Sequence, residues 1–259
     1  MTTALITGAS GGIGAVFAEQ LAARGHDLVL VARSQDKLQA IAEQLAATHG
    51  VTTTVMVQDL LAAGAAAQIF NQLAQQDIQV DLLVNNAGFG SYGEVADGDL
   101  PTYLNMIQLN VSVLVDLTHR ALQGMQQRRS GSILNISSIA AFQPMPYFAV
   151  YAATKSFVLS FSEALWYECQ PYGIQVLGVC PGPTETQFFK TAEFPDGLAS
   201  SEQSLAAPEV VVKEALQALE KGHSNVVTGG LMNQIIVNSG RFLPREALTK
   251  FVGEMFSTT

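Results

Sequence analysis

Short apolar runs, rich in β-branched residues, alternate along the chain with longer stretches in which apolar residues recur every three or four positions. The runs predict strands at residues 4–7, 27–32, 52–57, 82–84, 132–136, 175–179 and 225–227, and the stretches predict helices at 13–24, 35–48, 64–75, 100–128, 152–171 and 208–221. Because the runs are apolar at nearly every position, both faces of the sheet must be covered. The alternation therefore predicts an α/β fold, a doubly wound sheet of seven parallel strands with helices on both faces.

A single domain accounts for residues 1–259. Apolar residues are spread evenly, and 259 residues lies near the upper limit for one hydrophobic core. The net charge of −9, with Arg128-Arg129 as the longest cationic run, argues against nucleic acid as a partner. Cys169 and Cys180 lie in apolar patterns typical of core thiols, and the four histidines lack the spacing of a metal site, so no metal is expected.

The sequence also bears on location. No uncharged apolar run approaches the roughly 18 residues that a membrane span requires. The first predicted strand begins by Ala4, which leaves no room for a charged and apolar leader ahead of it. We therefore expect a cytoplasmic protein with no membrane span.

A glycine-rich turn joins the first predicted strand to the first predicted helix. Gly8 allows a tight turn, Gly12 lets the backbone approach a pyrophosphate, and Gly14 allows close helix packing. Free N–H groups at the helix start favour a diphosphate, although glycines also serve in plain turns. The turn predicts a dinucleotide site with these members: Gly8, Ser10, Gly12, Ile13 and Gly14.

The glycine spacing, G-x-x-x-G-x-G, resembles that of the short-chain dehydrogenase/reductase family, which implies a Rossmann-like fold and a nicotinamide cofactor. In dinucleotide sites an acid at the end of the second strand accepts hydrogen bonds from the adenosine ribose. This chain has Ala32 there, followed by Arg33 and Ser34. A guanidinium can bind a 2′-phosphate, and Ser34 and Ser10 can add hydroxyl donors, so we expect NADP(H) rather than NAD(H). Alternatively, Arg33 is a solvated loop cation.

Two further strand ends match cofactor positions of the family. The resemblance implies that Asp59, after the third strand, accepts a hydrogen bond from the adenine amino group, although Asp59 can equally cap the next helix. The fourth strand ends in Asn85-Asn86-Ala87-Gly88, which the resemblance implies steadies the central sheet and lines the adenine ribose. Paired asparagines otherwise often just close turns.

Tyr151 and Lys155 are four positions apart, on one face of a predicted helix. With Ser138 after the fifth strand and Asn110 in an earlier helix, they match the catalytic tetrad of the family. A phenol with a pKa of about 10 exchanges protons poorly at neutral pH, and a nearby ammonium favours its anion. The resemblance implies that Tyr151 is the general acid and base and that Lys155 bonds the nicotinamide ribose. It also implies that Ser138 binds the substrate oxygen and that Asn110 holds a kink and a water.

Each of these four residues has a plainer interpretation. Ser138 can cap a helix, and Asn110 can be a polar break in a long helix. Tyr151 and Lys155 can be an ordinary amphipathic pair. The catalytic interpretation is favoured because all four occupy the expected positions together.

The segment after the sixth strand matches a family segment whose backbone faces the nicotinamide carboxamide: Pro181, Gly182, Thr184 and Thr186. A Pro-Gly-Pro sequence otherwise marks only a turn between two elements. Residues 187–207 match a region that forms a substrate lid in the family. The lid and the catalytic segments carry large apolar side chains: Phe89, Phe142, Met145, Tyr147, Phe148, Phe188, Phe189, Phe194 and Pro195. Such a pocket fits a hydrophobic ketone, aldehyde or secondary alcohol.

Residues 229–259 depart from a common family ending in which an Asp-Gly-Gly turn helps to build a tetramer. Here a helix is predicted to open at Pro244, with one apolar face formed by Leu248, Phe251, Val252 and Met255. This extension can cover the pocket or a partner subunit, and a membrane surface is the least favoured contact. We expect a homo-oligomer, a dimer or a tetramer.

The sequence favours an NADPH-dependent oxidoreductase that moves hydride between the nicotinamide and a hydrophobic carbonyl compound or alcohol. A non-catalytic NADP(H)-binding sensor would keep the glycine turn without needing the tetrad. An S-adenosylmethionine-dependent methyltransferase shares the early glycine turn but usually has an acid where this chain has Ala32-Arg33. The identity of the substrate is not fixed by the sequence.

Overall fold

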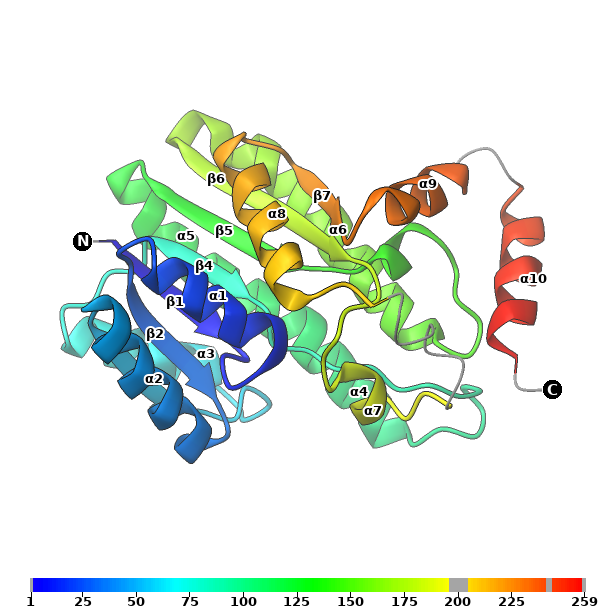
Figure 1. Cartoon of the computed structure of the whole chain (residues 1–259), viewed down its shortest axis with the longest axis horizontal. Helices are drawn as coiled ribbons and strands as arrows, with labels where there is room; N and C mark the ends of the chain where they lie inside the picture. The colour runs from blue at the N-terminus through cyan, green and yellow to red at the C-terminus, as the bar shows by residue number, and fades with distance from the viewer. Residues whose placement is uncertain (1, 196–204, 241–243, 258–259) are drawn as a thin grey trace.

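The predicted sheet is present in the computed structural model, which describes residues 2–195, 205–240 and 244–257 (Figure 1). Its strands are β1 (Thr3–Thr7), β2 (Asp27–Ala32), β3 (Thr53–Val57), β4 (Leu82–Asn85), β5 (Gly131–Ile136), β6 (Ile174–Pro181) and β7 (Asn225–Thr228). They form one sheet in the order β3-β2-β1-β4-β5-β6-β7, and all neighbours are parallel. The prediction of a doubly wound, seven-stranded parallel sheet is confirmed.

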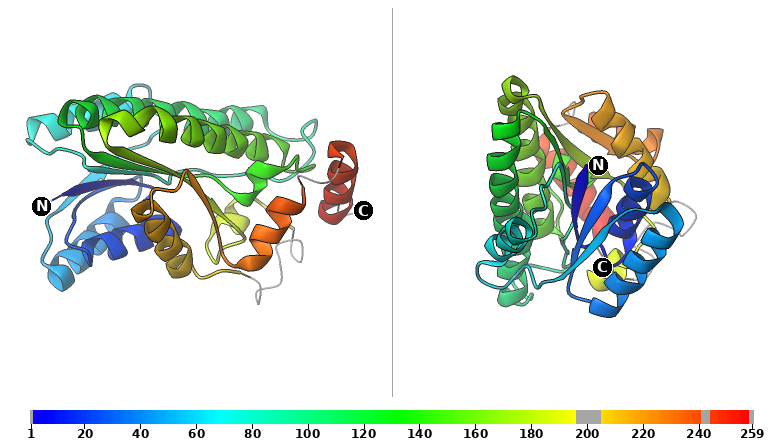
Figure 2. Two further views of the ribbon diagram at one scale, coloured as in Figure 1. Left: turned by 90° about the horizontal axis from the view of Figure 1, so that it is seen from above. Right: turned by 90° about the vertical axis from the view of Figure 1, so that its left-hand side faces the viewer.

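Helices cover both faces of the sheet (Figure 2). They include α1 (Gly12–Ala22), α2 (Gln35–His49), α3 (Ala65–Gln75), α5 (Leu114–Arg128), α6 (Ala149–Cys169) and α8 (Pro208–Glu220). One apolar core packs α1, α2 and α8 against the sheet, and a second packs α3, α5 and α6 against the opposite face. Along β2, Leu28 and Leu30 belong to the first core while Val29 and Val31 belong to the second. This alternation explains why the strands are apolar throughout.

The long helix predicted over residues 100–128 is interrupted. α4 (Leu100–Ile107) leads into a π-helical turn, η1 (Gln108–Val113), before α5 begins. A π turn adds a residue to one helical turn and so changes the direction of the side chains it carries. In this chain the turn contains the buried Asn110.

The carboxyl ends of β1 and β4 lie side by side, where the strand order reverses. Such a switch point leaves a crevice in which α/β proteins bind ligands. Two C-terminal helices, α9 (Leu231–Ser239) and α10 (Arg245–Phe256), lie at this end of the molecule, away from the N-terminus (Figure 1). The sequence predicted α10 but not α9. Within the described residues, no helix combines the length and apolar character needed to span a bilayer.

Candidate active site

At Gly8, Gly12 and Gly14, the turn between β1 and α1 is too closely packed to accept a side chain without strain. Gly8 has a φ of 66°, and a Cβ on it would lie 2.8 Å from Asn86 Nδ2. A Cβ on Gly14 would lie 2.3 Å from the backbone oxygen of Gly8, and one on Gly12 would lie 3.2 Å from Thr186 Cγ2. The turn, the end of β4 and the segment after β6 therefore meet at one point. The predicted close packing at Gly14 is confirmed.

The start of α1 has the chemistry of an anion site. Its N-cap is Gly11, which has no side chain to bond the N–H groups of the first turn. Gly11 and Gly12 are exposed, and Ser10 and Ile13 are partly exposed. The N–H groups and the helix dipole both stabilise negative charge. These residues fit the diphosphate of a dinucleotide.

Thr7 and Asn86 tie β1 to β4 beneath the turn. Asn86 Nδ2 donates to the backbone oxygens of Thr7 at 2.9 Å and Gly8 at 3.3 Å. Thr7 Oγ1 accepts from the N–H groups of Asn86 and Ala87, both at 3.0 Å. The buried Asn85 donates to side chains of α5 and β5. The expectation that the segment Asn85–Gly88 steadies the central sheet is confirmed. Thr7, which links β1 to β4 through these hydrogen bonds, was missed by the sequence analysis.

The end of β2 presents the residues expected near an adenosine. Arg33 and Ser34 are exposed and Ala32 is buried. None of the ion pairs between described residues uses Arg33. Asp59 is also exposed, and its Oδ1 accepts from the N–H of Leu61 at 3.0 Å. The helix-cap alternative for Asp59 is wrong, because the N-cap of α3 is Gly64.

Asn110 joins three segments from within the π turn. Its Oδ1 accepts from the N–H of Phe89 at 3.2 Å, and its Nδ2 donates to the Phe89 oxygen at 3.0 Å and to Thr154 Oγ1 at 3.1 Å. A Cβ on Gly88 would lie 2.8 Å from Asn110 Oδ1 and 3.5 Å from Lys155 Nζ, so both side chains border Gly88. The structure interrupts the helix with a π turn at Asn110, where a kink was expected, and the water-binding role of Asn110 stays a prediction.

Tyr151 lies in the first turn of α6 and is only 6% exposed. The Ser138 side chain is near enough to its phenol to affect the phenol's pKa. Ser138 Oγ accepts from the N–H of Ala140 at 3.1 Å and so caps the short 3₁₀ helix η2 (Ile139–Phe142). Ser138 therefore caps a helix, which was its plainer interpretation, and also lies beside Tyr151, as the catalytic interpretation requires. Burial raises the pKa of Tyr151, and the Ser138 side chain opposes that rise.

Lys155 lies one helical turn beyond Tyr151, as predicted. Its Nζ is 5.6 Å from the centroid of the Tyr151 ring and donates to the backbone oxygen of Ile136 at 2.8 Å. Burial lowers the pKa of Lys155 to about 8. We expected this ammonium to lower the pKa of Tyr151, but burial is the largest influence on the pKa of both side chains. The protein's own groups leave the Tyr151 pKa above its ordinary value.

Cys180 is a neighbour of this pair that the sequence analysis assigned only to the core. It is buried near the end of β6, where burial raises the pKa of its thiol to about 12 and a hydrogen bond with Ser137 opposes that rise. It interacts electrostatically with Tyr151 and Lys155. Its raised pKa keeps the thiol neutral at pH 7. In the described part of the chain, no three His, Cys, Asp or Glu side chains gather as a metal site.

The segment after β6 is held in place by α9. The N–H of Gly182 donates to the Thr228 oxygen at 3.3 Å, and Thr184 Oγ1 donates to the Gly182 oxygen at 2.9 Å. Asn233 Nδ2 donates to the oxygens of Thr228 at 2.9 Å and Gly229 at 3.0 Å. A Cβ on Gly182 would overlap the Asn233 side chain. Asn233 is a positioning residue that the sequence analysis missed, since it lies in the helix that was not predicted.

The expected lid, residues 187–207, has its two ends close together. Thr184 and Ala206 form a parallel bridge, and the Ala206 oxygen accepts from the N–H of Glu185 at 3.0 Å. The first part of the segment forms the short helix α7 (Phe188–Thr191). Residues 196–204 lie outside the described residues, and a closing role for this segment stays a prediction.

An aromatic cluster surrounds Tyr151. Phe148 stacks on the Tyr151 ring with centroids 4.3 Å apart, and Phe188 lies at 5.2 Å. Phe194 packs against Phe148 at 4.8 Å. The members of the cluster are Tyr92, Tyr147, Phe148, Phe188, Phe189, Phe194 and Phe256. The predicted apolar surroundings of Tyr151 are confirmed for most of the aromatic residues considered, but Phe142 lines a separate cavity near Thr249 of α10.

This chain is similar in sequence and fold to known proteins. Residues 2–195 match the family described as short chain dehydrogenase. The very-long-chain 3-oxoacyl-CoA reductase of Anas platyrhynchos is 36% identical over 197 residues, which cover 73% of this chain and 62% of the relative. Inactive hydroxysteroid dehydrogenase-like protein 1 of Homo sapiens is 31% identical over 243 residues, which cover 93% of this chain and 72% of the relative. A short-chain dehydrogenase from Sphingobium yanoikuyae, solved in complex with NADPH, gives a TM-score of 0.82 at 32% identity and covers 96% of this chain and 95% of that one.

The extent of these matches differs between curated relatives and solved structures. The aligned stretch spans only 54% and 62% of the length of two curated relatives, whereas the NADPH-bound structure is matched almost throughout. The family match itself covers the glycine turn, the tetrad positions and the segment after β6. This chain therefore belongs to the short-chain dehydrogenase/reductase family, oxidoreductases that bind NAD(P)(H) and act on CH–OH groups.

Proposed function

We propose that this protein transfers hydride between NADP(H) and a hydrophobic ketone or aldehyde, or the matching secondary alcohol, with Tyr151 as the general acid and base. The observation that carries the proposal is the Tyr151 phenol, which is buried, has its raised pKa partly lowered by the nearby Ser138 side chain, and lies one helical turn from Lys155. A carbonyl oxygen at this point would meet two hydroxyl donors, which stabilise the negative charge that develops on it. Tyr151 would give its proton to that oxygen in reduction and take it back in oxidation.

When bound, the nicotinamide supplies or accepts the hydride, and its oxidised form adds positive charge near the phenol. Lys155 keeps most of its ammonium charge at pH 7, because its pKa is about 8. Its position beside Gly88 suits a hydrogen bond to a ribose. The residues proposed to hold the dinucleotide are Gly8, Ser10, Gly12, Ile13, Gly14, Arg33, Ser34, Asp59, Asn86, Ala87, Gly88, Tyr151, Lys155, Pro181, Gly182, Thr184 and Thr186.

A preference for NADP(H) over NAD(H) is supported by Arg33. Its exposed guanidinium stands where an acid would repel a 2′-phosphate, and the described ion pairs do not use it. We expect Arg33→Ala to weaken NADPH binding by about 10- to 100-fold and to change NADH binding little. Fluorescence titration of both cofactors checks this, with Arg24→Ala as the matched control, since Arg24 pairs with Glu220 instead. Tighter binding of NADH than NADPH by the unmodified protein would contradict the preference.

A hydrophobic carbonyl substrate is supported by the aromatic cluster around Tyr151. The rings packed on Tyr151, Phe148 and Phe188, are uncharged and suit an apolar group beside the reacting carbonyl, while the ammonium of Lys155 is assigned to the ribose. One relative is named a very-long-chain 3-oxoacyl-CoA reductase, a name that describes a ketone on an apolar chain. The test is a panel of ketones, aldehydes and acyl thioesters scored by NADPH oxidation. We expect turnover of apolar ketones and little turnover of small charged ones.

A non-catalytic NADP(H) sensor remains the second candidate, because one relative carries the word inactive in its name. A sensor would bind NADPH but would not oxidise it in the presence of any carbonyl compound in the panel. The presence of Tyr151, Ser138 and Lys155 in one site favours the enzyme. A homo-oligomer and a cytoplasmic location stay predictions, which gel filtration and imaging of a tagged protein would test.

A further inference from the structure

The start of α6, which carries Tyr151, is weakly fixed by its own residues. Its N-cap is Phe148, whose side chain makes no capping hydrogen bond, so the helix lacks one of the bonds that usually fix its first turn. The residue before it, Tyr147, has a φ of 62°, in the left-handed region that is strained for a bulky side chain. The direction of Tyr151 therefore depends on contacts from elsewhere in the fold.

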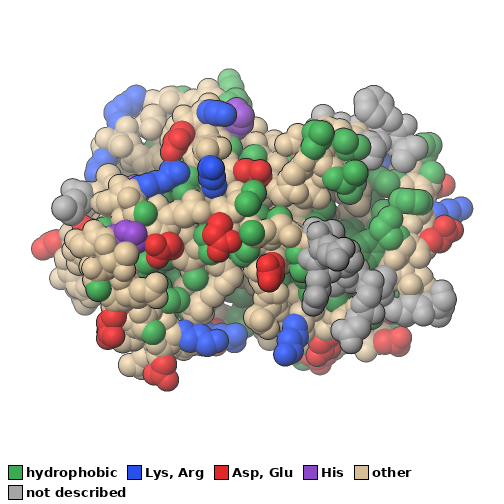
Figure 3. All heavy atoms as spheres, viewed as in Figure 1, with side chains coloured by type: hydrophobic (Ala, Val, Ile, Leu, Met, Phe, Trp, Pro, Cys, Tyr) green, Lys and Arg blue, Asp and Glu red, His purple; other side chains and the backbone are tan. Residues whose placement is uncertain are grey.

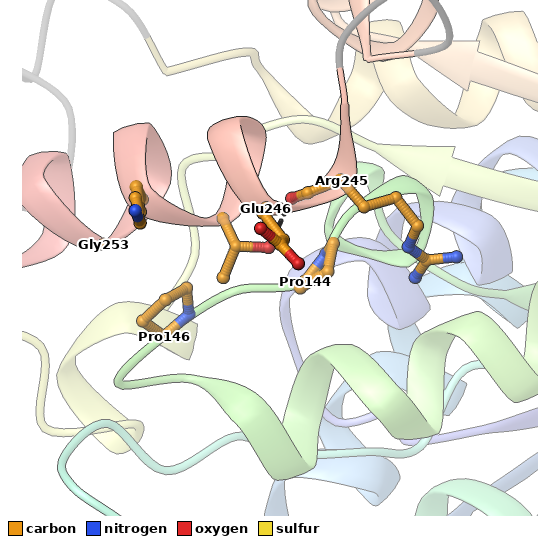
Figure 4. Close-up of a pocket in the computed structure, with 7 residues that line it drawn as sticks. Pro144, Pro146, Arg245, Glu246 and Gly253 are labelled. Carbon is orange, nitrogen blue, oxygen red and sulfur yellow. Dashed lines mark hydrogen bonds between the residues drawn. The ribbon is translucent and has the colours of Figure 1, made fainter.

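The outer side of this helix start receives little support. Figure 4 shows Pro144 and Pro146, in the segment before α6, opposite α10 across a cavity of about 510 Å³. A second cavity, of about 710 Å³, reaches the exposed face of α6 at Ala149 and Ala153. Figure 3 shows a hollow in the molecular surface between α9 and α10, with hydrophobic side chains on its two sides. Since these spaces are not filled, α10 does little to fix the first turn of α6 from this side.

The inner side of the same turn is joined to the π turn by a chain of hydrogen bonds through Thr154. Asn110 Nδ2 donates to Thr154 Oγ1 at 3.1 Å, and Thr154 Oγ1 donates to the backbone oxygen of Tyr151 at 2.7 Å. Only 1% of Asn110 and 4% of Thr154 is exposed. The other Nδ2 hydrogen of Asn110 goes to the Phe89 oxygen, and its Oδ1 accepts from the Phe89 N–H, so the amide cannot turn without breaking these bonds. Thr154 therefore connects a fixed amide to the backbone of Tyr151.

We propose that Thr154 is a positioning residue, which holds the Tyr151 phenol in place beside Ser138, and this inference rests on the proposed function. The single hydroxyl hydrogen of Thr154 goes to the Tyr151 oxygen, which leaves a lone pair for Asn110 and fixes the side chain in one direction. Phe148 also packs on the Tyr151 ring, but apolar contacts are not directional and allow the ring to slide. A proton donor must keep its position closely, because a displacement of about 1 Å can slow a reaction strongly.

The experiment compares two variants of Thr154. Thr154→Val keeps the shape of the side chain and removes the hydroxyl, whereas Thr154→Ser keeps the hydroxyl. On an apolar ketone with saturating NADPH, we expect Thr154→Val to lower kcat by about tenfold and to leave the Kd for NADPH within about twofold. Thr154→Ser should restore kcat to within about threefold of the wild type. In the oxidation direction, the rate of Thr154→Val should rise at a higher pH than that of the wild type, because a displaced phenol loses stabilisation of its anion.

Ser162→Ala is the matched control on the same helix. Ser162 Oγ accepts from Asn135 Nδ2 at 3.0 Å and donates to the Val158 oxygen at 2.7 Å, the same arrangement farther from the phenol. It should lower the melting temperature about as much as Thr154→Val and leave kcat and its pH dependence unchanged. A readout without turnover is the NMR resonance of the Tyr151 Cζ atom, in protein grown on isotope-labelled tyrosine and assigned by its loss in Tyr151→Phe. This resonance should shift in Thr154→Val and not in Ser162→Ala.

The outcomes separate this inference from the proposed function. A shifted Tyr151 resonance in Thr154→Val, without turnover by the wild type, would support the positioning role and contradict the enzyme. Turnover by the wild type, with Thr154→Val matching Ser162→Ala in kcat, pH dependence and resonance, would overturn the positioning role and leave the enzyme. Neither turnover nor a shift would overturn both. If Thr154→Val does not fold, Thr154→Ala removes the hydroxyl without placing a methyl group against Asn110, and the same outcomes apply to it.

Discussion

The cofactor end and the substrate end of this molecule are built by different means. At the glycine turn, backbone atoms approach so closely that Gly14 packs directly against the Gly8 oxygen. Around Tyr151, the geometry depends instead on aromatic side chains from separate segments, with Phe148, Phe188 and Phe194 packed on one another. Backbone contacts of the first kind admit a single residue type, whereas side-chain packing of the second kind can be achieved by many combinations.

The largest expected effect tests whether close backbone contacts at the cofactor end admit only glycine. Gly14→Ala places a Cβ 2.3 Å from a backbone oxygen that cannot move aside. We expect it to destabilise the protein by about 3 kcal/mol and to abolish NADPH binding. Gly11→Ala is the matched control, because nothing lies within 4 Å of its Cβ, and it should cost less than about 1 kcal/mol. Urea unfolding and fluorescence titration measure both, and equal behaviour of the two variants would break the comparison.

The next largest effect concerns Lys155, which lies between the two ends. Its folded pKa of about 8 is below its unfolded value, so the unfolded state binds more protons between these two values. The stability of the wild type relative to Lys155→Met should therefore rise with pH above about 8, by about 1.4 kcal/mol per pH unit at most. Comparing the two proteins cancels contributions from other groups. A difference that stays flat from pH 7 to 10 would show that Lys155 is less buried than described.

A smaller effect tests how the two ends are joined through α9. Asn233→Ala removes the donor to the oxygens of Thr228 and Gly229 and loosens the segment around Gly182. We expect a loss of about 1–2 kcal/mol and weaker NADPH binding. Asn238→Ala on the same helix is the matched control. It removes an exposed hydrogen bond to the Gln234 oxygen and should lower the free energy of unfolding by only about 0.3 kcal/mol. If both variants behave alike in thermal unfolding and titration, Asn233 does not position the cofactor segment.

The comparison also explains what could be predicted from the sequence. The strands were predicted to within two residues because continuous apolar runs are required by a sheet covered on both faces. Gly8, Gly12 and Gly14 were recognised because backbone geometry restricts those positions to few residue types, whereas the role of Asn85–Gly88 was implied by the family resemblance. The π turn was expected only as a kink at Asn110, since a hydrogen-bond shift of one residue leaves the apolar periodicity of the helix nearly intact.

The parts that were missed depend on long-range packing. Thr7, Cys180 and Asn233 act through neighbours that only the folded chain brings close. The helix α9 is short and follows two glycines, so its pattern did not predict a helix. One apolar face was expected on α10, but only Leu248 and Val252 are buried while Phe251 and Met255 are exposed. The balance that sets the Tyr151 pKa was also misjudged, because burial cannot be read from spacing.

The central claim is that the Tyr151 phenol handles the proton, and Tyr151→Phe tests it most directly. The substitution removes one hydroxyl while the ring still stacks on Phe148. The claim predicts at least about a 10²-fold loss of kcat on an apolar ketone with the Kd for NADPH unchanged. Turnover within a few-fold of the wild type, at equal NADPH affinity, would contradict it.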